Sequence, residues 1–191
     1  MSDLELVYNT GAAWTDLLGT RRHAYSPQPL ERLTDPDRLT EWLTTVGLPP
    51  ATPPDETDLA LARATREAIR LLAHSTLSST QHTLPLTADA PPAADAAALL
   101  GELSRASAPA FTIGDTGAVT PTRPENTRDA LGRLAQSAVA DLAHHPADFG
   151  VCSDAACAKI YLDPSHLRKA CCDTCSTRLR VRAFRQKAKN T

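Results

Sequence analysis

The sequence predicts a mainly α-helical protein with a minor β-hairpin, in which a helical N-terminal domain is followed by a small C-terminal module. Hydrophobic residues make up 42% of the chain but aromatic residues only 4%, and much of the remainder is Ala and Leu, which favours helices. All five cysteines lie within residues 152–175, and the two ends of the chain differ in charge. We therefore assign residues 1–148 to the domain and residues 149–191 to the module.

The net charge of −2 conceals an acidic body and a basic tail. Residues 151–191 hold nine basic and three acidic side chains, a charge of +6, so the first 150 residues carry −8. This division predicts two modules, the second of which faces a polyanion. The N-terminal sequence lacks a secretory signal, and no apolar run approaches the roughly 18–20 residues that span a bilayer. We expect a cytoplasmic protein that does not enter a membrane, in which clustered cysteines bind metal rather than form disulfides.

Local patterns predict three elements in the first 50 residues. Residues 4–10, "LELVYNT", indicate a short strand or the start of a helix, and one helical turn is expected at residues 14–18. A clearer helix follows in "TDPDRLTEWLTTVG", where Asp35 is placed to cap the helix and Gly47 to end it.

The longest predicted helix covers residues 58–77. Its periodicity places four residues on one stripe, namely Leu61, Thr65, Ala68 and Leu72. It also places a charged set on or beside the opposite face, namely Arg63, Arg66, Glu67 and Arg70.

Three further elements precede the cysteines. An Ala-rich helix is expected at residues 93–106, and "PAFTIGDTGAVTPTRP" reads as a hairpin around its Gly-Asp-Thr-Gly turn. The segment "ENTRDALGRLAQSAVADLAHH" predicts a helix that is capped by Asn126 or Thr127 and ended by Pro146.

The cysteines have the spacing of a structural zinc site. Zinc prefers four thiolates in a tetrahedron, supplied by two closely spaced pairs. Cys152 and Cys157 form one pair, and the second is either Cys172-x2-Cys175 or Cys171-x3-Cys175. The residues between the pairs predict a short strand and an Asp-Pro turn, and the last cysteine begins a helix. The spacing does not match the common iron–sulfur runs, so we expect one structural Zn²⁺.

A basic helix is predicted after the last cysteine, in "STRLRVRAFRQKAKNT". One face is cationic, and Val181, Phe184 and Ala188 form an apolar stripe beside it. A helix tied at one end by metal and basic along one face suits contact with a phosphate backbone, so we expect DNA as partner. The alternative is a protein–protein or intramolecular docking unit, with the helix clamped on the acidic body and no DNA bound. The candidate DNA-binding residues are Arg178, Arg180, Arg182, Arg185, Lys187 and Lys189.

The cysteine segment resembles the CGNR zinc finger. That family has a C-x4-C pair, an "LFLDxSR"-like strand and turn, "RRWC", and then "CGNR" with a basic tail. The counterparts here are Cys152 and Cys157, "IYLDPSH", "RKAC" and "CSTR". Ser and Thr replace the Gly and Asn of the signature, and Ala replaces the aromatic residue before the cysteine. The resemblance implies a treble-clef-like zinc module with Cys152, Cys157, Cys171 and Cys175 as ligands, and leaves Cys172 as the alternate to Cys171.

The remainder of the chain is similar to the ABATE domain, the N-terminal partner of that finger. "LELVYNT" resembles its opening "LxLDFVNT", "LTEWLTTVGL" its Leu-x2-Trp-Leu helix, and "ATREAIR" its "LREALR" segment. The resemblance implies a transcription regulator that responds to stress or to a small ligand, and it leaves room for a homodimer. The polar matches make Asn9, Thr10, Arg66 and Arg70 candidates for a small-anion site.

Catalysis is not expected from this sequence. A zinc ion with four thiolate ligands has no open position, and the chain has no Gly-rich phosphate loop. His144 and His145 fall at the end of a predicted helix, where they fit a capping role.

Overall fold

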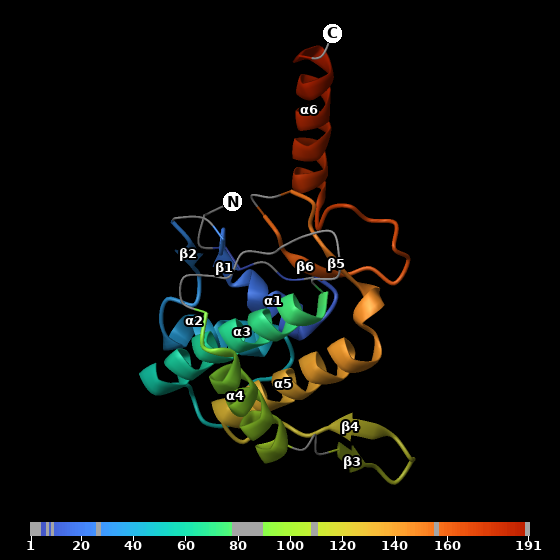
Figure 1. Cartoon of the computed structure of the whole chain (residues 1–191). Helices are drawn as coiled ribbons and strands as arrows, with labels where there is room; N and C mark the ends of the chain where they lie inside the picture. The colour runs from blue at the N-terminus through green and yellow to red at the C-terminus, as the bar shows by residue number, and fades with distance from the viewer. Residues whose placement is uncertain are drawn as a thin grey trace.

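The structure, a computed structural model, describes residues 5–6, 8, 10–25, 28–77, 90–107, 111–154 and 157–189 (Figure 1). The helices are α1 (Ala13–Gly19), α2 (Pro36–Thr45), α3 (Glu56–Leu77), α4 (Ala93–Ala106), α5 (Thr127–His144) and α6 (Asp173–Lys189), with a 3-10 turn η1 (Pro146–Asp148). The strands are β1 (Arg21–Arg22), β2 (Leu30–Glu31), β3 (Phe111–Ile113), β4 (Val119–Pro121), β5 (Phe149–Val151) and β6 (Ile160–Leu162).

The architecture is mainly helical with small antiparallel hairpins, as the composition predicted. Helices α3, α4 and α5 pack against one another and form the body, with α1 and α2 beside them (Figure 1). The body core is built on fully buried residues from all five of these helices, among them Trp14, Trp42, Ile69, Leu103 and Leu131. No helix in the described residues is long and apolar enough to cross a membrane.

Two helix starts follow the capping rules on which the sequence prediction rested. The Asp35 side chain accepts a hydrogen bond from the backbone nitrogen of Arg38 at 2.8 Å and so caps α2. Asn126 caps α5 by accepting from the nitrogen of Asp129 at 2.9 Å. The helix α3 begins at Glu56, two residues earlier than predicted, and the described part of residues 4–10 lies in neither a strand nor a helix.

A glycine sets the close crossing of α4 and α5. A Cβ atom on Gly132 would lie 2.1 Å from the Ser107 hydroxyl and 2.6 Å from the Leu103 carbonyl oxygen, so no larger residue fits without movement of α4. Gly101 in α4 differs, because its Cβ would meet only the flexible guanidinium of Arg105, at 3.2 Å.

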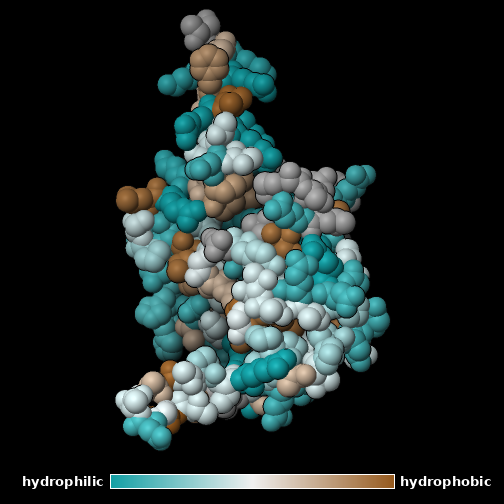
Figure 2. All heavy atoms as spheres, turned by 180° about the vertical axis from the view of Figure 1, so that it is seen from behind, coloured by the Kyte–Doolittle hydropathy of each residue, from teal (hydrophilic) through white to brown (hydrophobic). Residues whose placement is uncertain are grey.

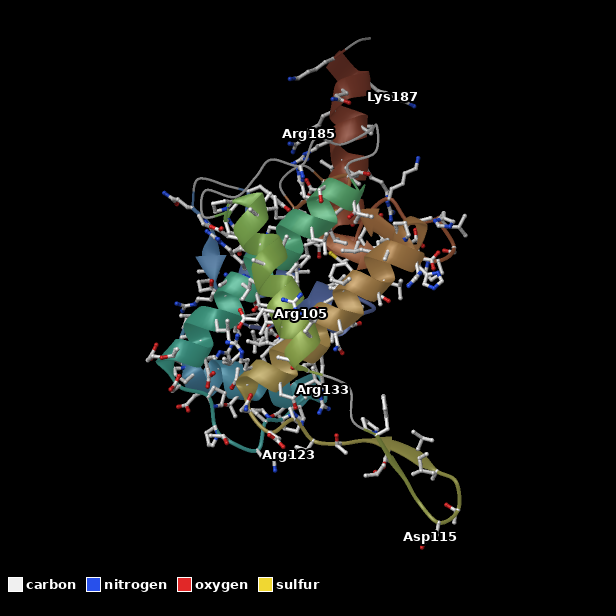
Figure 3. All side chains as sticks on the ribbon, turned by 60° about the horizontal axis from the view of Figure 1, so that its bottom comes forward. Arg105, Asp115, Arg123, Arg133, Arg185 and Lys187 are labelled. Carbon is white, nitrogen blue, oxygen red and sulfur yellow. The ribbon has the colours of Figure 1, made fainter. Side chains whose placement is uncertain are left out.

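The predicted hairpin is β3 paired with β4, and it projects from the body (Figure 3). Arg123 and Arg133, labelled at its base, hold it in place through backbone carbonyls. The Arg123 guanidinium donates to the Pro49 oxygen at 3.0 Å and to the Pro50 oxygen at 2.6 Å, and Arg133 donates to Thr122 at 2.5 Å. The exposed side chains of Phe111, Ile113 and Val119 show that this hairpin contributes little to the core.

The cysteine module docks on α1 of the body. The ring of Phe149 in β5 lies 4.9 Å from that of Trp14, and the nitrogen of Leu162 in β6 donates to the Thr10 oxygen at 2.9 Å. Gly11 permits this approach, because its φ is +107° and a Cβ there would lie 2.4 Å from the Leu162 Cβ. Phe149 and Ile160 also join the body core, so the module shares a hydrophobic core with the domain that precedes it.

Candidate metal centre and basic helix

Four cysteines gather at the junction of β5, β6 and α6. The Sγ atoms of Cys152, Cys157, Cys171 and Cys175 all lie within 4.8 Å of one another. The Sγ atoms of Cys157 and Cys171 are 3.6 Å apart, and those of Cys171 and Cys175 are 3.8 Å apart. Cys172 is exposed and lies outside this group, although its sulfur is 3.8 Å from that of Cys171. The structure thus brings together the four residues that the CGNR resemblance singled out.

The first cysteine pair is held by a tight backbone turn. The nitrogens of Cys157 and Ala158 both donate to the Asp154 oxygen, at 2.7 and 3.0 Å, and Cys152 donates to the Lys159 oxygen at 2.9 Å. Ala158 has a φ of +44°, a conformation that L-residues adopt at some cost, so the turn is specified by its surroundings.

Arg168 supports the second pair. Its guanidinium lies over the buried Tyr161 ring at 4.7 Å and donates to the Cys171 oxygen at 2.6 Å. The Tyr161 hydroxyl donates to the Arg168 oxygen at 2.8 Å, while the Asp163 carboxylate accepts from the Arg168 nitrogen at 2.9 Å and from Ser165 at 2.8 Å. The residues of "IYLDPSH" and "RKAC" therefore orient the cysteine loop, as outer groups of metal sites do.

The electrostatics of the four thiols favour a cation among them. Hydrogen bonds from the Cys157 and Cys171 thiols lower the pKa of Cys152, whereas the bonds that they donate to Cys152 raise the pKa of both donors. Burial and the neighbouring thiolates raise the pKa of Cys175. Four thiolates held this close together repel one another, and a metal ion bound among them would remove that repulsion.

The sulfur spacing fits a tetrahedral metal ion. Zinc–sulfur bonds of about 2.3 Å place the corners of a tetrahedron about 3.8 Å apart. The separations of 3.6 and 3.8 Å agree with that edge length. The cluster could therefore hold one metal ion in a closed set of four thiolates.

Asp154, which the sequence interpretation missed, ties α6 to the first cysteine turn. Its carboxylate is completely buried and accepts from Arg182 at 2.7 Å and from Arg178 at 3.4 Å. These two arginines belong to the set assigned to DNA, and in the structure both guanidinium groups face Asp154. The sequence offered one signal for this contact, because an acidic residue lies between the first two cysteines and several arginines follow the last cysteine.

Beyond the ion pairs of Asp154 with Arg178 and Arg182, α6 extends away from the body (Figure 1). The side chains from Val181 to Lys189 are all exposed, including Val181 and Phe184. Figure 2 shows the projecting helix mainly in hydrophilic colours with apolar atoms between them, and Figure 3 shows Arg185 and Lys187 on it. Leu179, at the base, packs on the cysteine cluster.

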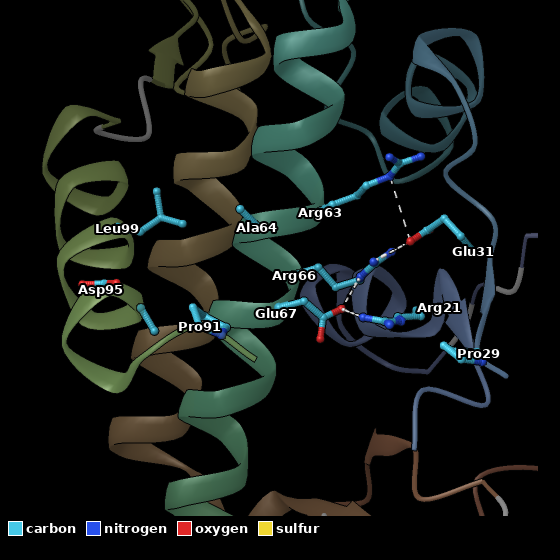
Figure 4. A pocket seen from close by; sticks show the side chains of 11 residues that line it. Arg21, Pro29, Glu31, Arg63, Ala64, Arg66, Glu67, Pro91, Asp95 and Leu99 are labelled. Carbon is cyan, nitrogen blue, oxygen red and sulfur yellow. Dashed lines mark hydrogen bonds and ion pairs between the residues drawn. The ribbon is translucent and has the colours of Figure 1, made fainter. Parts of the chain in front are cut away.

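Three of the four charged residues assigned to the outer side of α3 are buried, namely Arg66, Glu67 and Arg70, whereas Arg63 is partly exposed. Arg66 is 2% exposed and binds both oxygens of Glu31, at 2.8 and 2.6 Å, and Glu67 at 2.9 Å. Arg70 donates to Glu67 at 3.0 Å (Figure 4 shows the network around Arg66 and Glu67). Burial raises the pKa of Glu67, but Arg70 and Arg66 outweigh it and hold the pKa below its ordinary value. These side chains can be buried because each charge has a partner: Glu31 of β2 pairs with Arg66, and Glu67 pairs with Arg66 and Arg70.

The structure describes three of the four residues proposed for a ligand, and these three line two cavities. Asn9 lies outside the described residues. Thr10 donates to Asp16 at 2.7 Å and lines a cavity of about 540 Å³ together with Arg70. Arg66 faces a different cavity, of about 750 Å³, between α3, α4 and β2 (Figure 4).

The fold and the site define a mainly helical protein with a C-terminal four-cysteine cluster able to bind a metal ion. Residues 11–146 match ABATE, a family described as "Putative stress-induced transcription regulator", and the chain belongs to that family. The matched range ends before the cysteine cluster. No curated protein matches the chain.

Proposed function

We propose that the protein is a cytoplasmic transcription regulator in which a structural Zn²⁺, held by Cys152, Cys157, Cys171 and Cys175, fixes a DNA-binding helix. The tetrahedral sulfur spacing and the all-thiolate donor set support zinc. Four thiolates leave no open coordination position, so the ion acts on the fold of the module and not on a substrate.

The observation that carries DNA binding is the exposed, basic, outward half of α6. Asp154 engages Arg178 and Arg182. The other basic side chains of α6 are exposed and would contact the phosphates, namely Arg180, Arg185, Lys187 and Lys189. Lysine and arginine on one projecting helix neutralise backbone phosphates without reading bases, which predicts weak sequence preference.

A salt titration of duplex binding tests this function. Each phosphate contact contributes about −0.9 to the slope of log K against log salt, so four contacts predict a slope of about −3.6. The double variant Arg185→Gln/Lys189→Gln should make the slope shallower by about 1.8. The control variant Arg105→Gln/Arg128→Gln, on the body, should leave it unchanged. Absence of duplex binding at low salt would refute the proposal.

A second candidate function is a docking module that binds no DNA. The Asp154 ion pairs support it, because they show α6 already using two arginines within the chain. In that case the basic tail stabilises the module or meets an acidic protein, and the zinc-loaded chain shows no salt-dependent affinity for duplex DNA.

Small-ligand sensing by the helical body is the remaining part of the proposal. The buried ion pairs of α3 and the two cavities beside them support it, because a ligand that competes for these charges would change the packing of the body.

A further inference from the structure

A cavity of about 540 Å³ lies between the helical body and the cysteine module. The body contributes Leu18, Arg22 and Arg32 to its wall, and the module contributes Lys159 and Arg178. Neither part forms the cavity alone, and its volume is within the range of small-molecule sites.

The wall of this cavity is strongly cationic. Six basic side chains line it, and none of the described lining residues is Asp or Glu. Among the described residues, Glu67 pairs with Arg21 and Arg70, Asp154 pairs with Arg178, and Asp16 accepts a hydrogen bond from Thr10. The six are Arg21, Arg22, Arg32, Arg70, Lys159 and Arg178.

The remaining lining groups indicate the shape of a ligand. Tyr8, Leu18, Ala24 and Ile160 supply apolar surface, and Thr10 and Thr15 supply hydroxyl groups. The cavity also borders the candidate metal centre, because Cys157, Cys171 and Cys175 line it. Guanidinium groups bind carboxylate and phosphate oxygens in a planar, bidentate geometry. We infer that the cavity binds a small organic anion that carries a phosphate or carboxylate group next to a short apolar part.

Such an anion would contact both halves of the protein. Arg178 lies in the first turns of α6, and its contact with Asp154, at 3.4 Å, is longer than that of Arg182, at 2.7 Å. A bound anion offers Arg178 a second partner and therefore alters how the base of α6 is held. This consequence rests on the proposed function: anion binding changes DNA affinity, and DNA changes anion affinity by the same factor.

Calorimetry on the zinc-loaded full chain tests the site without DNA, using inorganic phosphate, AMP and succinate as probes. We expect saturable binding of at least one probe with a Kd below about 1 mM. Binding of phosphate and AMP alone identifies a phosphate site, and binding of succinate identifies a carboxylate site. The variant Arg22→Met/Lys159→Met should weaken binding at least about tenfold, since charged hydrogen bonds are lost.

Two controls show whether a loss of binding comes from the cavity wall itself. Arg105→Met removes an exposed cation of α4 that is remote from the cavity and should bind the probe like the native chain. Arg22→Met alone leaves the cysteine turn intact, so it reports on the site even if the double variant loses zinc. Binding of none of the three probes, or equal binding by Arg22→Met and the native chain, overturns the inference.

DNA titrations at matched ionic strength distinguish this failure from failure of the proposed function. If the native chain binds the probe but no DNA, the anion site is supported and the proposed DNA-binding function is refuted. If it binds DNA but none of the probes, the DNA-binding function is supported and the anion site is refuted. If both bind, the probe should change the Kd for DNA in the native chain and in Arg105→Met, but not in Arg22→Met.

Discussion

Replacement of Asp154 by Asn should loosen the attachment of α6 to the cysteine cluster. Asn keeps the size of the side chain and one acceptor oxygen, but it removes the charge that faces Arg178 and Arg182. The carboxylate is completely buried, whereas the two arginine side chains are 43% and 52% exposed. Water therefore screens the arginine end of each pair, and the loss falls below that of a fully buried ion pair.

The expected loss is about 1–2 kcal/mol, which combines two screened ion pairs with the weaker hydrogen bonds of a neutral acceptor. A loss of this size changes an opening equilibrium by about 5–30-fold. If zinc leaves through local opening of the module, transfer of zinc to a colorimetric chelator should accelerate by the same factor. Hydrogen exchange of the first turns of α6 should accelerate in parallel.

The matched control is Asp115→Asn, the same chemical change at the exposed tip of the hairpin (Figure 3). It should release zinc at the native rate. Adding Arg182→Met to Asp154→Asn should accelerate release little further, because the two groups act through one contact. The proposed role of the Asp154 ion pairs would be refuted if Asp154→Asn released zinc at the native rate, or if Asp115→Asn accelerated zinc release equally.

Three other predictions follow from the same structure. Cys171→Ser should lose stoichiometric zinc and Cys172→Ser should retain one ion per chain by mass spectrometry; equal loss in both would contradict the ligand assignment. By urea unfolding, Gly132→Ala should lower the free energy of unfolding by about 1–3 kcal/mol, because its Cβ meets α4, and Gly101→Ala should raise it by about 0.5–1 kcal/mol. Stabilisation by both would disprove the close crossing. Glu67→Gln should cost about 3 kcal/mol at neutral pH, since buried arginines lose a partner. The native Glu67 has a folded-state pKa below its ordinary 4.5, so its contribution is complete above that pH and is lost as pH falls through the folded pKa. The deficit of the variant should therefore shrink in acid, and a deficit independent of pH would contradict the ion pairs.

Much of the fold could be predicted because its signals are local. The cap at Asp35 and the cap at Asn126 each depend on a backbone nitrogen three residues away. Capping and helix-ending residues located α2 and α5, and an Ala-rich composition located α4. Glycines in a short polar run located the β3–β4 hairpin. The short β1–β2 pair was missed, because two-residue strands carry no periodic signal.

The charged side of α3 shows where such reasoning ends. Arg66, Glu67 and Arg70 have the spacing of a solvated face, and a periodicity argument assigns charge to solvent by default. The partners of Arg66 include Thr20 and Glu31, 46 and 35 residues away, and only the folded chain places them beside it. Burial of these charges is tolerated because each finds an oppositely charged or polar partner.

The sequence by itself determined the helical class, the division into an acidic body and a basic tail, and the presence of a cysteine cluster with the spacing of a metal site. These depend on composition and on neighbours a few residues apart. The tertiary structure decided that Asp154 engages two arginines 24 and 28 residues away, and that basic residues from body and module meet in one cavity. The physical reason is that an ion pair or a cavity wall forms only between groups that packing brings together, whatever their distance along the chain.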